Sequence, residues 1–178
     1  MKYNASFKIC IFGEAGVGKT SLTYRYISNR FKDDTKLTLG VDIVAHDIVL
    51  GSNRIKLQIW DFGGEERFRV FLPAYVRGSS GAIFMYDITR KNTLDNIAEW
   101  LSVFKNNVED EEENIPILCV GGKTDLEEER EVDVEDVKPL IQKYDLYGVT
   151  ECSAKTGENV QKIFESISYE ILKNIGLV

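Results

Sequence analysis

The sequence contains no apolar run that approaches the roughly 20 residues a helix needs to cross a lipid bilayer. The N-terminus also lacks the charged segment and long apolar stretch of a signal peptide, since the run at residues 7–12 is too short. We therefore expect a protein that is neither exported nor inserted directly into a membrane.

Cysteine and histidine are scarce. The cysteines are Cys10, Cys119 and Cys152, an odd number, and each lies in or beside a short apolar run. We expect them to be reduced thiols in the core rather than disulfides, reactive groups or metal ligands. The single histidine, His46, lies on an alternating segment and is expected to be an exposed polar residue. A chain of 178 residues can bury a sizeable core without cross-links.

Basic residues are not in excess. Lysine and arginine number 22 against 29 acidic residues, which gives a formal net charge of -7. This balance argues against nucleic acid or an anionic membrane surface as a main partner. We interpret the acidic runs at residues 109–113 and 127–131 as solvated loops. With no repeat and no linker, the sequence predicts one domain over residues 1–178, with a flexible N-terminus at residues 1–6.

The apolar pattern predicts an α/β domain. A strand, a glycine loop and a helix come first, then two alternating segments around a turn, then short apolar strands separated by helical stretches. This order is typical of a mostly parallel six-stranded sheet with one antiparallel edge hairpin and helices on both faces. The predicted strands are 7–13, 41–50, 54–60, 82–87, 115–121 and 147–152, and the predicted helices are 20–28, 94–107, 134–144 and 159–175.

A phosphate-binding pattern lies where the first strand passes into the first helix. The residues that match G-x-x-x-x-G-K-[ST] are Gly13, Glu14, Ala15, Gly16, Val17, Gly18, Lys19 and Thr20, followed by Ser21. Such a loop turns backbone N–H groups toward phosphates at a helix N-terminus, and the lysine adds a point charge. The pattern predicts a nucleotide triphosphate site in which Thr20 gives its hydroxyl to Mg²⁺.

Two later segments identify the base. Gly121-Gly122-Lys123-Thr124-Asp125 and Glu151-Cys152-Ser153-Ala154-Lys155 each follow a strand and resemble the N-K-x-D and S-A-K motifs of Ras superfamily small GTPases. The resemblance implies a P-loop small GTPase domain that binds GTP and GDP. An ATP-dependent kinase or transferase is the poorer alternative, because Asp125 and Ser153-Ala154-Lys155 would have no role in it.

The resemblance also implies roles for the residues of the base site. Asp125 would accept two hydrogen bonds from guanine, and the Ala154 N–H would meet the guanine carbonyl. Lys123 and Phe31 would cover the two faces of the ring. Leu126, Ser153 and Lys155 complete this expected site.

The switch elements follow from the same resemblance. Asp61-Phe62-Gly63-Gly64 resembles D-x-x-G, in which the aspartate holds Mg²⁺ through water and the glycine N–H senses the γ-phosphate. Thr38 matches the threonine that closes onto Mg²⁺ and the γ-phosphate. The expected catalytic set is Lys19, Thr38, Gly64 and Glu65.

Further strings resemble the Rab branch, and the match spans residues 7–175. They are Leu39-Gly40-Val41-Asp42, Lys56-Leu57-Gln58-Ile59-Trp60, Arg67-Phe68-Arg69, Tyr75-Val76-Arg77-Gly78 and Met85-Tyr86-Asp87-Ile88-Thr89. The branch implies a monomeric switch in vesicle traffic with effectors, an exchange factor and a GTPase-activating protein as partners. Ile43, Trp60 and Tyr75 occupy the positions that read effectors, with core packing as the alternative for each.

Three residues depart from the family pattern. Glu65 stands in place of the glutamine that orients the attacking water, so we expect slow hydrolysis. Ala15 occupies a P-loop position that is glycine in Ras but varies among Rabs, so a side chain there need not abolish hydrolysis, although it can hinder an arginine finger. Gly122 replaces a base-binding asparagine. Glu65 and Gly122 leave open a second interpretation, a nucleotide-locked binding module that does not turn over.

Two observations bear on metal sites and membranes. Asp33 and Asp34 are expected to be solvated loop residues rather than metal ligands. The chain ends at Ile175-Gly176-Leu177-Val178 with no cysteine to prenylate, so we expect a cytoplasmic protein that associates with membranes only if a lipidated tail is missing.

Overall fold

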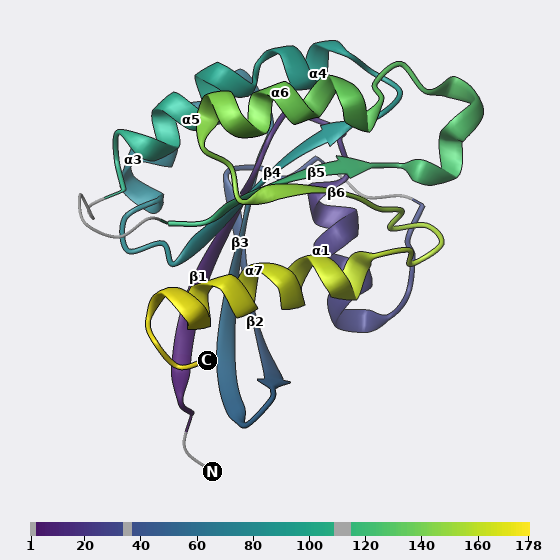
Figure 1. The fold of residues 1–178 in the computed structure, drawn as a ribbon. Coiled ribbons are helices and arrows are strands. Elements are labelled where there is room, and N and C mark those ends of the chain that lie inside the picture. The colour runs from purple at the N-terminus through teal and green to yellow at the C-terminus, as the bar shows by residue number, and fades with distance from the viewer. Residues whose placement is uncertain (1–2, 34–36, 109–114) are drawn as a thin grey trace.

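A computed structural model describes residues 3–33, 37–108 and 115–178 and contains the predicted six-stranded sheet (Figure 1). The strand order is β2-β3-β1-β4-β5-β6, and every neighbouring pair is parallel except β2 with β3. The strands are β1 (Ala5–Phe12), β2 (Val41–Leu50), β3 (Asn53–Phe62), β4 (Gly81–Asp87), β5 (Ile117–Gly122) and β6 (Gly148–Glu151).

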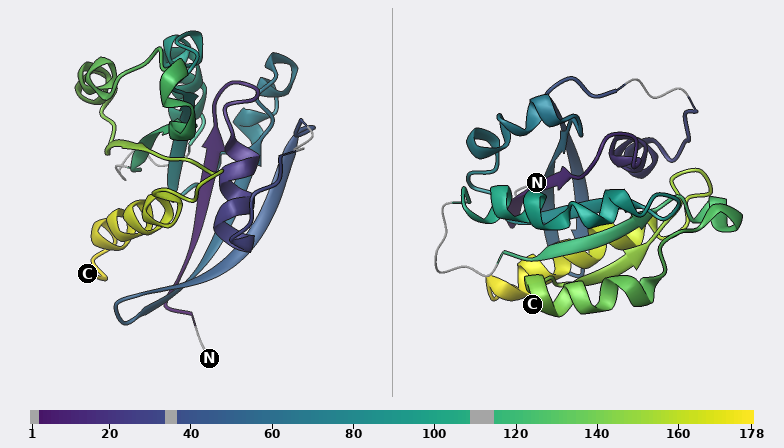
Figure 2. Two further views of the ribbon diagram at one scale, coloured as in Figure 1. Left: turned by 90° about the vertical axis from the view of Figure 1, so that its right-hand side faces the viewer. Right: turned by 90° about the horizontal axis from the view of Figure 1, so that it is seen from above.

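The helices cover both faces of the sheet, as predicted (Figures 1 and 2). One layer contains α1 (Lys19–Ser28) and α7 (Val160–Asn174), whose apolar sides pack on Ile9 and Ile11 of β1. The other contains α3 (Leu72–Tyr75), α4 (Asn92–Asp95), α5 (Ile97–Lys105) and α6 (Val134–Tyr144), packed around Phe12 and Phe84. The central strand β4 is buried throughout because helices lie on both its faces.

The predicted helix 94–107 is wrong as a single element. It is divided into α4 and α5 at Asn96, whose ψ of 6° is not helical. Before this break, Thr93 Oγ1 accepts the Asp87 N–H at 3.0 Å and donates to Arg90 O at 2.7 Å, which ties the start of α4 to the end of β4. A side chain that bonds local backbone competes with a continuous helix.

Some strand and helix ends also differ from the predictions. β1 begins two residues earlier, at Ala5, and β5 begins at Ile117 because Pro116 has no N–H to donate to a neighbouring strand. Three short elements were not predicted: α2 (Glu66–Arg69), α3 and the 3₁₀ helix η1 (Thr124–Glu129). By contrast, β2 and α6 have their predicted bounds, and α6 begins with a capping box between Asp133 and Asp136.

The prediction for His46 needs correction. Its side chain is half-buried and packs edge-on against Tyr26, with ring centroids 5.1 Å apart. The three cysteines are free and buried, as predicted. Of the acidic runs, 127–131 lies on exposed η1 and the turn after it, with Arg130 half-buried, and 109–113 falls outside the described residues. Within the described part of the chain, no helix has the length and apolar character of a membrane span.

Candidate nucleotide-binding site

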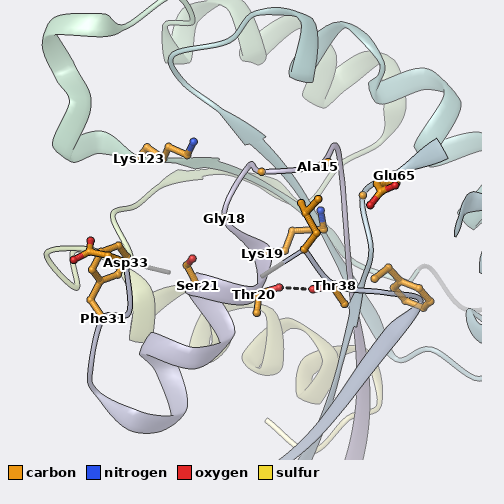
Figure 3. A pocket seen from close by; sticks show the side chains of 14 residues that line it. Ala15, Gly18, Lys19, Thr20, Ser21, Phe31, Asp33, Thr38, Glu65 and Lys123 are labelled. Atoms are coloured by element: carbon orange, nitrogen blue, oxygen red, sulfur yellow. Dashed lines mark hydrogen bonds between the residues drawn. The ribbon is translucent and has the colours of Figure 1, made fainter. Parts of the chain in front are cut away.

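A cleft opens at the carboxyl ends of the parallel strands, where ligands bind in sheets of this kind (Figure 3). It consists of two adjoining cavities of about 260 and 230 Å³. Both are lined by Gly18, Ser21, Phe31, Asp33 and Lys123, so they form one continuous site. Asp33 is exposed at this cleft, and Asp34 lies outside the described residues.

The first cavity is built around the glycine-rich loop after β1. Gly13, Gly16 and Gly18 have φ values of 143°, 73° and 106°, which L side chains rarely adopt. Only glycine fits at position 13, since a Cβ there would lie 2.1 Å from Met85 O. Gly18 precedes α1 and offers no side-chain cap, so the first N–H groups of this ten-residue helix remain available to an anion.

Lys19 places a buried cation in this loop. Its side chain is 6% exposed, and Nζ donates to Gly13 O and Glu14 O at 2.8 Å each. Burial lowers the pKa of Lys19 to about 8, and the nearby carboxylates of Asp61 and Glu14 offset this effect only in part. A phosphate group in the cavity would supply the missing negative charge.

The residues predicted to hold Mg²⁺ converge at the start of α1. Thr20 Oγ1 lies 2.7 Å from Thr38 Oγ1 and donates to Asp61 Oδ2 at 2.5 Å (Figure 3 shows the two threonines). Asp61 is 2% exposed, its Oδ1 has no hydrogen-bond partner, and burial raises its pKa to about 6. An unpartnered buried carboxylate oxygen beside two hydroxyls fits a hard cation that takes oxygen ligands.

A metal ion at these three residues would need further ligands. Among the described residues, no group of three or more histidine, cysteine, aspartate or glutamate side chains could hold a metal ion. The protein's own donors are one carboxylate and two hydroxyls, so phosphate oxygens and water would complete the octahedron that Mg²⁺ requires.

The second cavity contains the residues predicted to read the base. Asp125 Oδ1 accepts a hydrogen bond from Ser153 Oγ at 2.6 Å, and Lys155 Nζ lies 4.0 Å from Asp125 Oδ2. Ser153 itself is buried and also accepts the Thr156 N–H, so it holds the carboxylate rather than lining the cavity. The lining includes Val17, Asp125, Leu126, Ala154 and Lys155.

The segment that follows β3, at Gly64 and Glu65, contacts the phosphate loop. A Cβ on Gly64 would lie 2.4 Å from the backbone of Glu14 and Ala15, so only glycine permits this approach. Glu65 lines the first cavity and pairs with Arg67 at 2.8 Å. The carboxylate that replaces the expected glutamine is therefore already engaged by a cation.

Glu14 points away from the cleft. Its Oε1 accepts hydrogen bonds from Arg69 at 2.5 Å, Trp100 Nε1 at 2.9 Å and Asn96 at 3.1 Å. Arg69 also pairs with Glu99 at 2.6 Å and lies over the Trp100 ring. These contacts, which we call the Glu14 latch, tie α2 to the phosphate loop and to α5. If Glu14 binds the nucleotide as predicted, it would therefore do so through its backbone and not through its side chain.

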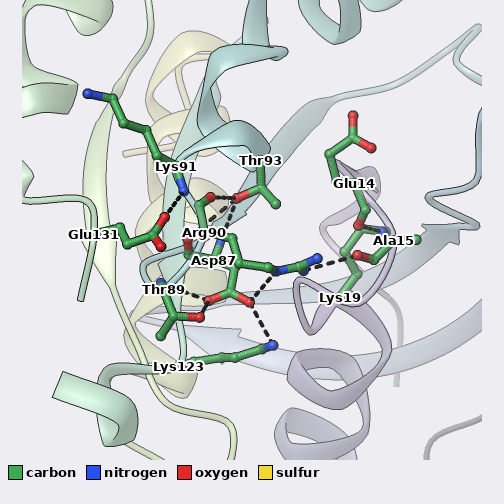
Figure 4. A network of polar contacts seen from close by, with 10 residues as sticks. All are labelled: Glu14, Ala15, Lys19, Asp87, Thr89, Arg90, Lys91, Thr93, Lys123 and Glu131. Carbon is green, nitrogen blue, oxygen red and sulfur yellow. Dashed lines mark hydrogen bonds and ion pairs between the residues drawn. The ribbon is translucent and has the colours of Figure 1, made fainter. Parts of the chain in front are cut away.

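Asp87 organises a second network that the sequence did not reveal (Figure 4). Its buried carboxylate pairs with Lys123 at 2.7 Å and Arg90 at 3.0 Å, and it accepts two bonds from Thr89. Arg90 in turn donates to Ala15 O at 3.1 Å. The network joins the end of β4 to the phosphate loop and to the base-binding segment.

The three proposed effector residues form a surface cluster. Ile43 on β2 pairs with Trp60 on β3, and the Trp60 and Tyr75 rings lie 6.0 Å apart. Ile43 is 51% and Tyr75 38% exposed, whereas Trp60 is half-buried under Lys8. The alternative interpretation, that these side chains only pack in the core, is therefore wrong for Ile43 and Tyr75. For Trp60 it is correct in part.

Comparisons with known proteins agree with this geometry. The Ras family profile matches residues 8–173. GTP-binding protein ypt3 of Schizosaccharomyces pombe is 38% identical over 172 residues, which cover 97% of this chain and 78% of the relative. Ras-related protein Rab-4B of Rattus norvegicus is 38% identical over 97% of this chain and 79% of its own length. Ras-related protein Rab11A of Lotus japonicus is 37% identical over 96% and 74%. The chain therefore belongs to the Ras family and is a Rab-like small GTPase.

Proposed function

We propose that this protein is a Mg²⁺-dependent GTP switch that hydrolyses GTP slowly and recruits effector proteins in its GTP state. The observation that carries the proposal is the position of Asp125. Its carboxylate is held by Ser153 in a cavity that continues into the glycine-rich loop. A carboxylate at one end of a phosphate site selects a base with adjacent N–H donors, which guanine has and adenine lacks.

Positioning and electrostatics carry the proposed hydrolysis. Lys19 and the N–H groups at the start of α1 would hold the β- and γ-phosphates. Thr20, Thr38 and, through water, Asp61 would hold Mg²⁺, which neutralises charge on the phosphate oxygens when it is bound. The Gly64 N–H would contact the γ-phosphate, and loss of that contact would release both switch segments. The full proposed nucleotide set is Glu14, Ala15, Gly16, Val17, Gly18, Lys19, Thr20, Ser21, Phe31, Thr38, Gly64, Lys123, Asp125, Leu126, Ser153, Ala154 and Lys155.

The slow rate rests on Glu65. A carboxylate accepts a proton from water but has no amide donor, and it brings negative charge toward an anionic γ-phosphate. The ion pair with Arg67 at 2.8 Å draws this carboxylate toward its own segment. The negative charge near the γ-phosphate and the pull of Arg67 both oppose the alignment of an attacking water by Glu65.

Partners are proposed from the family. A GTPase of this kind works with effectors, an exchange factor and a GTPase-activating protein, and in the Rab branch it acts in vesicle traffic. The exposed cluster of Ile43, Trp60 and Tyr75 supports an effector surface beside both switches. We propose a monomer in which this face is free until an effector binds.

A second candidate is a nucleotide-locked binding module. The observation that favours it is Glu65 itself, a carboxylate paired with Arg67 on the wall of the first cavity, where the family pattern has a neutral amide. In this case GTP would be held without useful turnover, and the protein would remain in its effector-binding state.

One experiment separates these functions. The protein is purified without added nucleotide and denatured, the bound nucleotide is identified, and one turnover of loaded GTP is followed with Mg²⁺. Bound guanine nucleotide with measurable conversion to GDP supports the switch. GTP that persists for many hours supports the locked module, and a site filled with adenine nucleotide contradicts both.

A further inference from the structure

Met85 fills the space beside Gly122 that a side chain at position 122 would need. Met85 lies near the end of β4 and is 1% exposed. A Cβ built on Gly122 would lie 2.5 Å from Met85 Cε and 3.0 Å from Val17 O. Cβ atoms do not approach other atoms that closely, so a side chain fits at position 122 only if the thioether moves. The glycine and the methionine are sterically matched.

The same methionine belongs to the wall of the base cavity. It lines that cavity together with Lys123 and Asp125. Its methyl carbon also lies 3.4 Å from the position of a Cβ on Gly18. The thioether thus lies between the glycine-rich loop and the end of β5, at the junction of the phosphate and base halves of the cleft.

From this placement we propose that Met85 is a nucleotide-binding residue whose thioether forms an apolar wall of the base pocket in place of a side chain at position 122. The inference rests on the proposed function and assigns it a further residue. Methionine suits the task because its unbranched, polarizable chain fills irregular gaps. Because a thioether carries no hydrogen-bond donor, this wall would hold the purine by contact alone.

The surroundings of Met85 determine where its methyl group would move. It packs in the core cluster with buried neighbours that include Val17, Val120 and Cys152. The open side is the cavity it lines. A side chain at position 122 would therefore push the methyl group into the space that the base needs.

A double-mutant cycle on nucleotide release tests the pair. The proteins are wild type, Met85→Val, Gly122→Asn and the double variant, and the measurement is the dissociation rate of a fluorescent GDP with Mg²⁺ present. We expect Gly122→Asn alone to speed release by about tenfold, although asparagine is the residue the family motif has there. The double variant should recover wild-type retention, because valine removes the closest contact, with Met85 Cε at 2.5 Å, and leaves only the tight one with Val17 O at 3.0 Å. Residues in contact give coupling of roughly twofold to a hundredfold.

Two controls keep the test decisive. Ile83→Val shortens a buried side chain on the same face of β4 that lines neither half of the cleft, and it should leave the release rate unchanged. Gly122→Ala adds the same Cβ with less bulk and replaces Gly122→Asn if thermal melting shows that the asparagine variant does not fold.

The failures are distinguishable. If wild type binds no guanine nucleotide, the proposed function and this inference both fail. If wild type binds GDP but Gly122→Asn binds as tightly or more tightly with Met85 in place, only this inference is overturned. This inference is also overturned if the release rate of the double variant is the product of the two single effects, because the two residues would then act independently.

Discussion

The ammonium nitrogen of Lys123 lies 2.7 Å from Oδ2 of Asp87, which joins the base-binding segment after β5 to the end of β4. The Asp87 side chain is fully buried and also pairs with Arg90, which holds the carbonyl of Ala15 in the phosphate loop. Burial alone would raise the pKa of Asp87, but hydrogen bonds from Lys123, Thr89 and Arg90 lower it overall. One ionised carboxylate therefore connects the two halves of the nucleotide site.

Asp87→Asn should weaken this connection without changing the size of the side chain. Lys123 and Arg90 would lose a charged partner, and the free energy of unfolding should fall by about 1–3 kcal/mol. This range is kept low because solvent screens both cations, which are partly exposed. GDP should dissociate faster, since Lys123 and the Ala15 backbone are held less firmly. Thermal melting and nucleotide-release rates check this, with Asp95→Asn as the control because Asp95 is exposed on α4. Release as slow as in wild type would show that the network does not support the site.

Glu65→Gln should accelerate hydrolysis. The amide restores a donor, removes a negative charge near the γ-phosphate and loosens the ion pair with Arg67. We expect a single-turnover rate about tenfold higher, which corresponds to ~1.4 kcal/mol of activation free energy. Glu66→Gln, at the exposed neighbouring position, removes the same charge from the segment and is the control. Equal rates for wild type and Glu65→Gln would mean that Glu65 does not limit hydrolysis.

Arg69→Met should release α2 from the Glu14 latch. The methionine keeps an apolar stem over Trp100 but loses the hydrogen bonds to Glu14 and Glu99. Hydrogen exchange in residues 66–75 should then speed up, with the local opening free energy lower by about 1 kcal/mol. Glu99→Gln is the matched control, because Glu99 is 62% exposed and its pair should contribute little. If exchange in this segment does not change, the latch does not hold α2.

Removal of Mg²⁺ should speed nucleotide release, and the size of this effect should depend on pH. Burial raises the pKa of Asp61 to about 6 in the metal-free protein, above its ordinary value of 3.8. Because the folded protein binds this proton more tightly than the unfolded chain does, protonated Asp61 stabilises the fold below about pH 4. This stabilisation is lost as the pH rises through about 6. Protons compete with the metal over the same interval, so the effect of chelation should be large at pH 7 and small at pH 5. Release rates with and without EDTA at both pH values check this, and Asp61→Asn should remove the dependence. An equal effect of EDTA at both values would contradict the assignment of Asp61.

Much of the site follows from local sequence. The glycine-rich loop requires the positive φ values found at Gly13, Gly16 and Gly18, and no other residue adopts them so readily. Segments with a single period, such as β2 and α6, were also predicted with their observed bounds because pattern and end signals agree there. No local pattern indicates the division at Asn96, where the backbone leaves the helical range between α4 and α5.

Local sequence patterns predict the fold class, the phosphate loop and the segments that we propose as sources of base and metal ligands, because each of these depends on residues that are near neighbours along the chain. Three contacts follow from the packing of the folded chain: Glu14 bonds to Arg69 and Trp100, Asp87 pairs with Lys123 and Arg90, and Met85 lies beside Gly122. These contacts join segments that meet only when β4 pairs with β1 and β5, so their geometry depends on strand order and packing rather than on any local pattern.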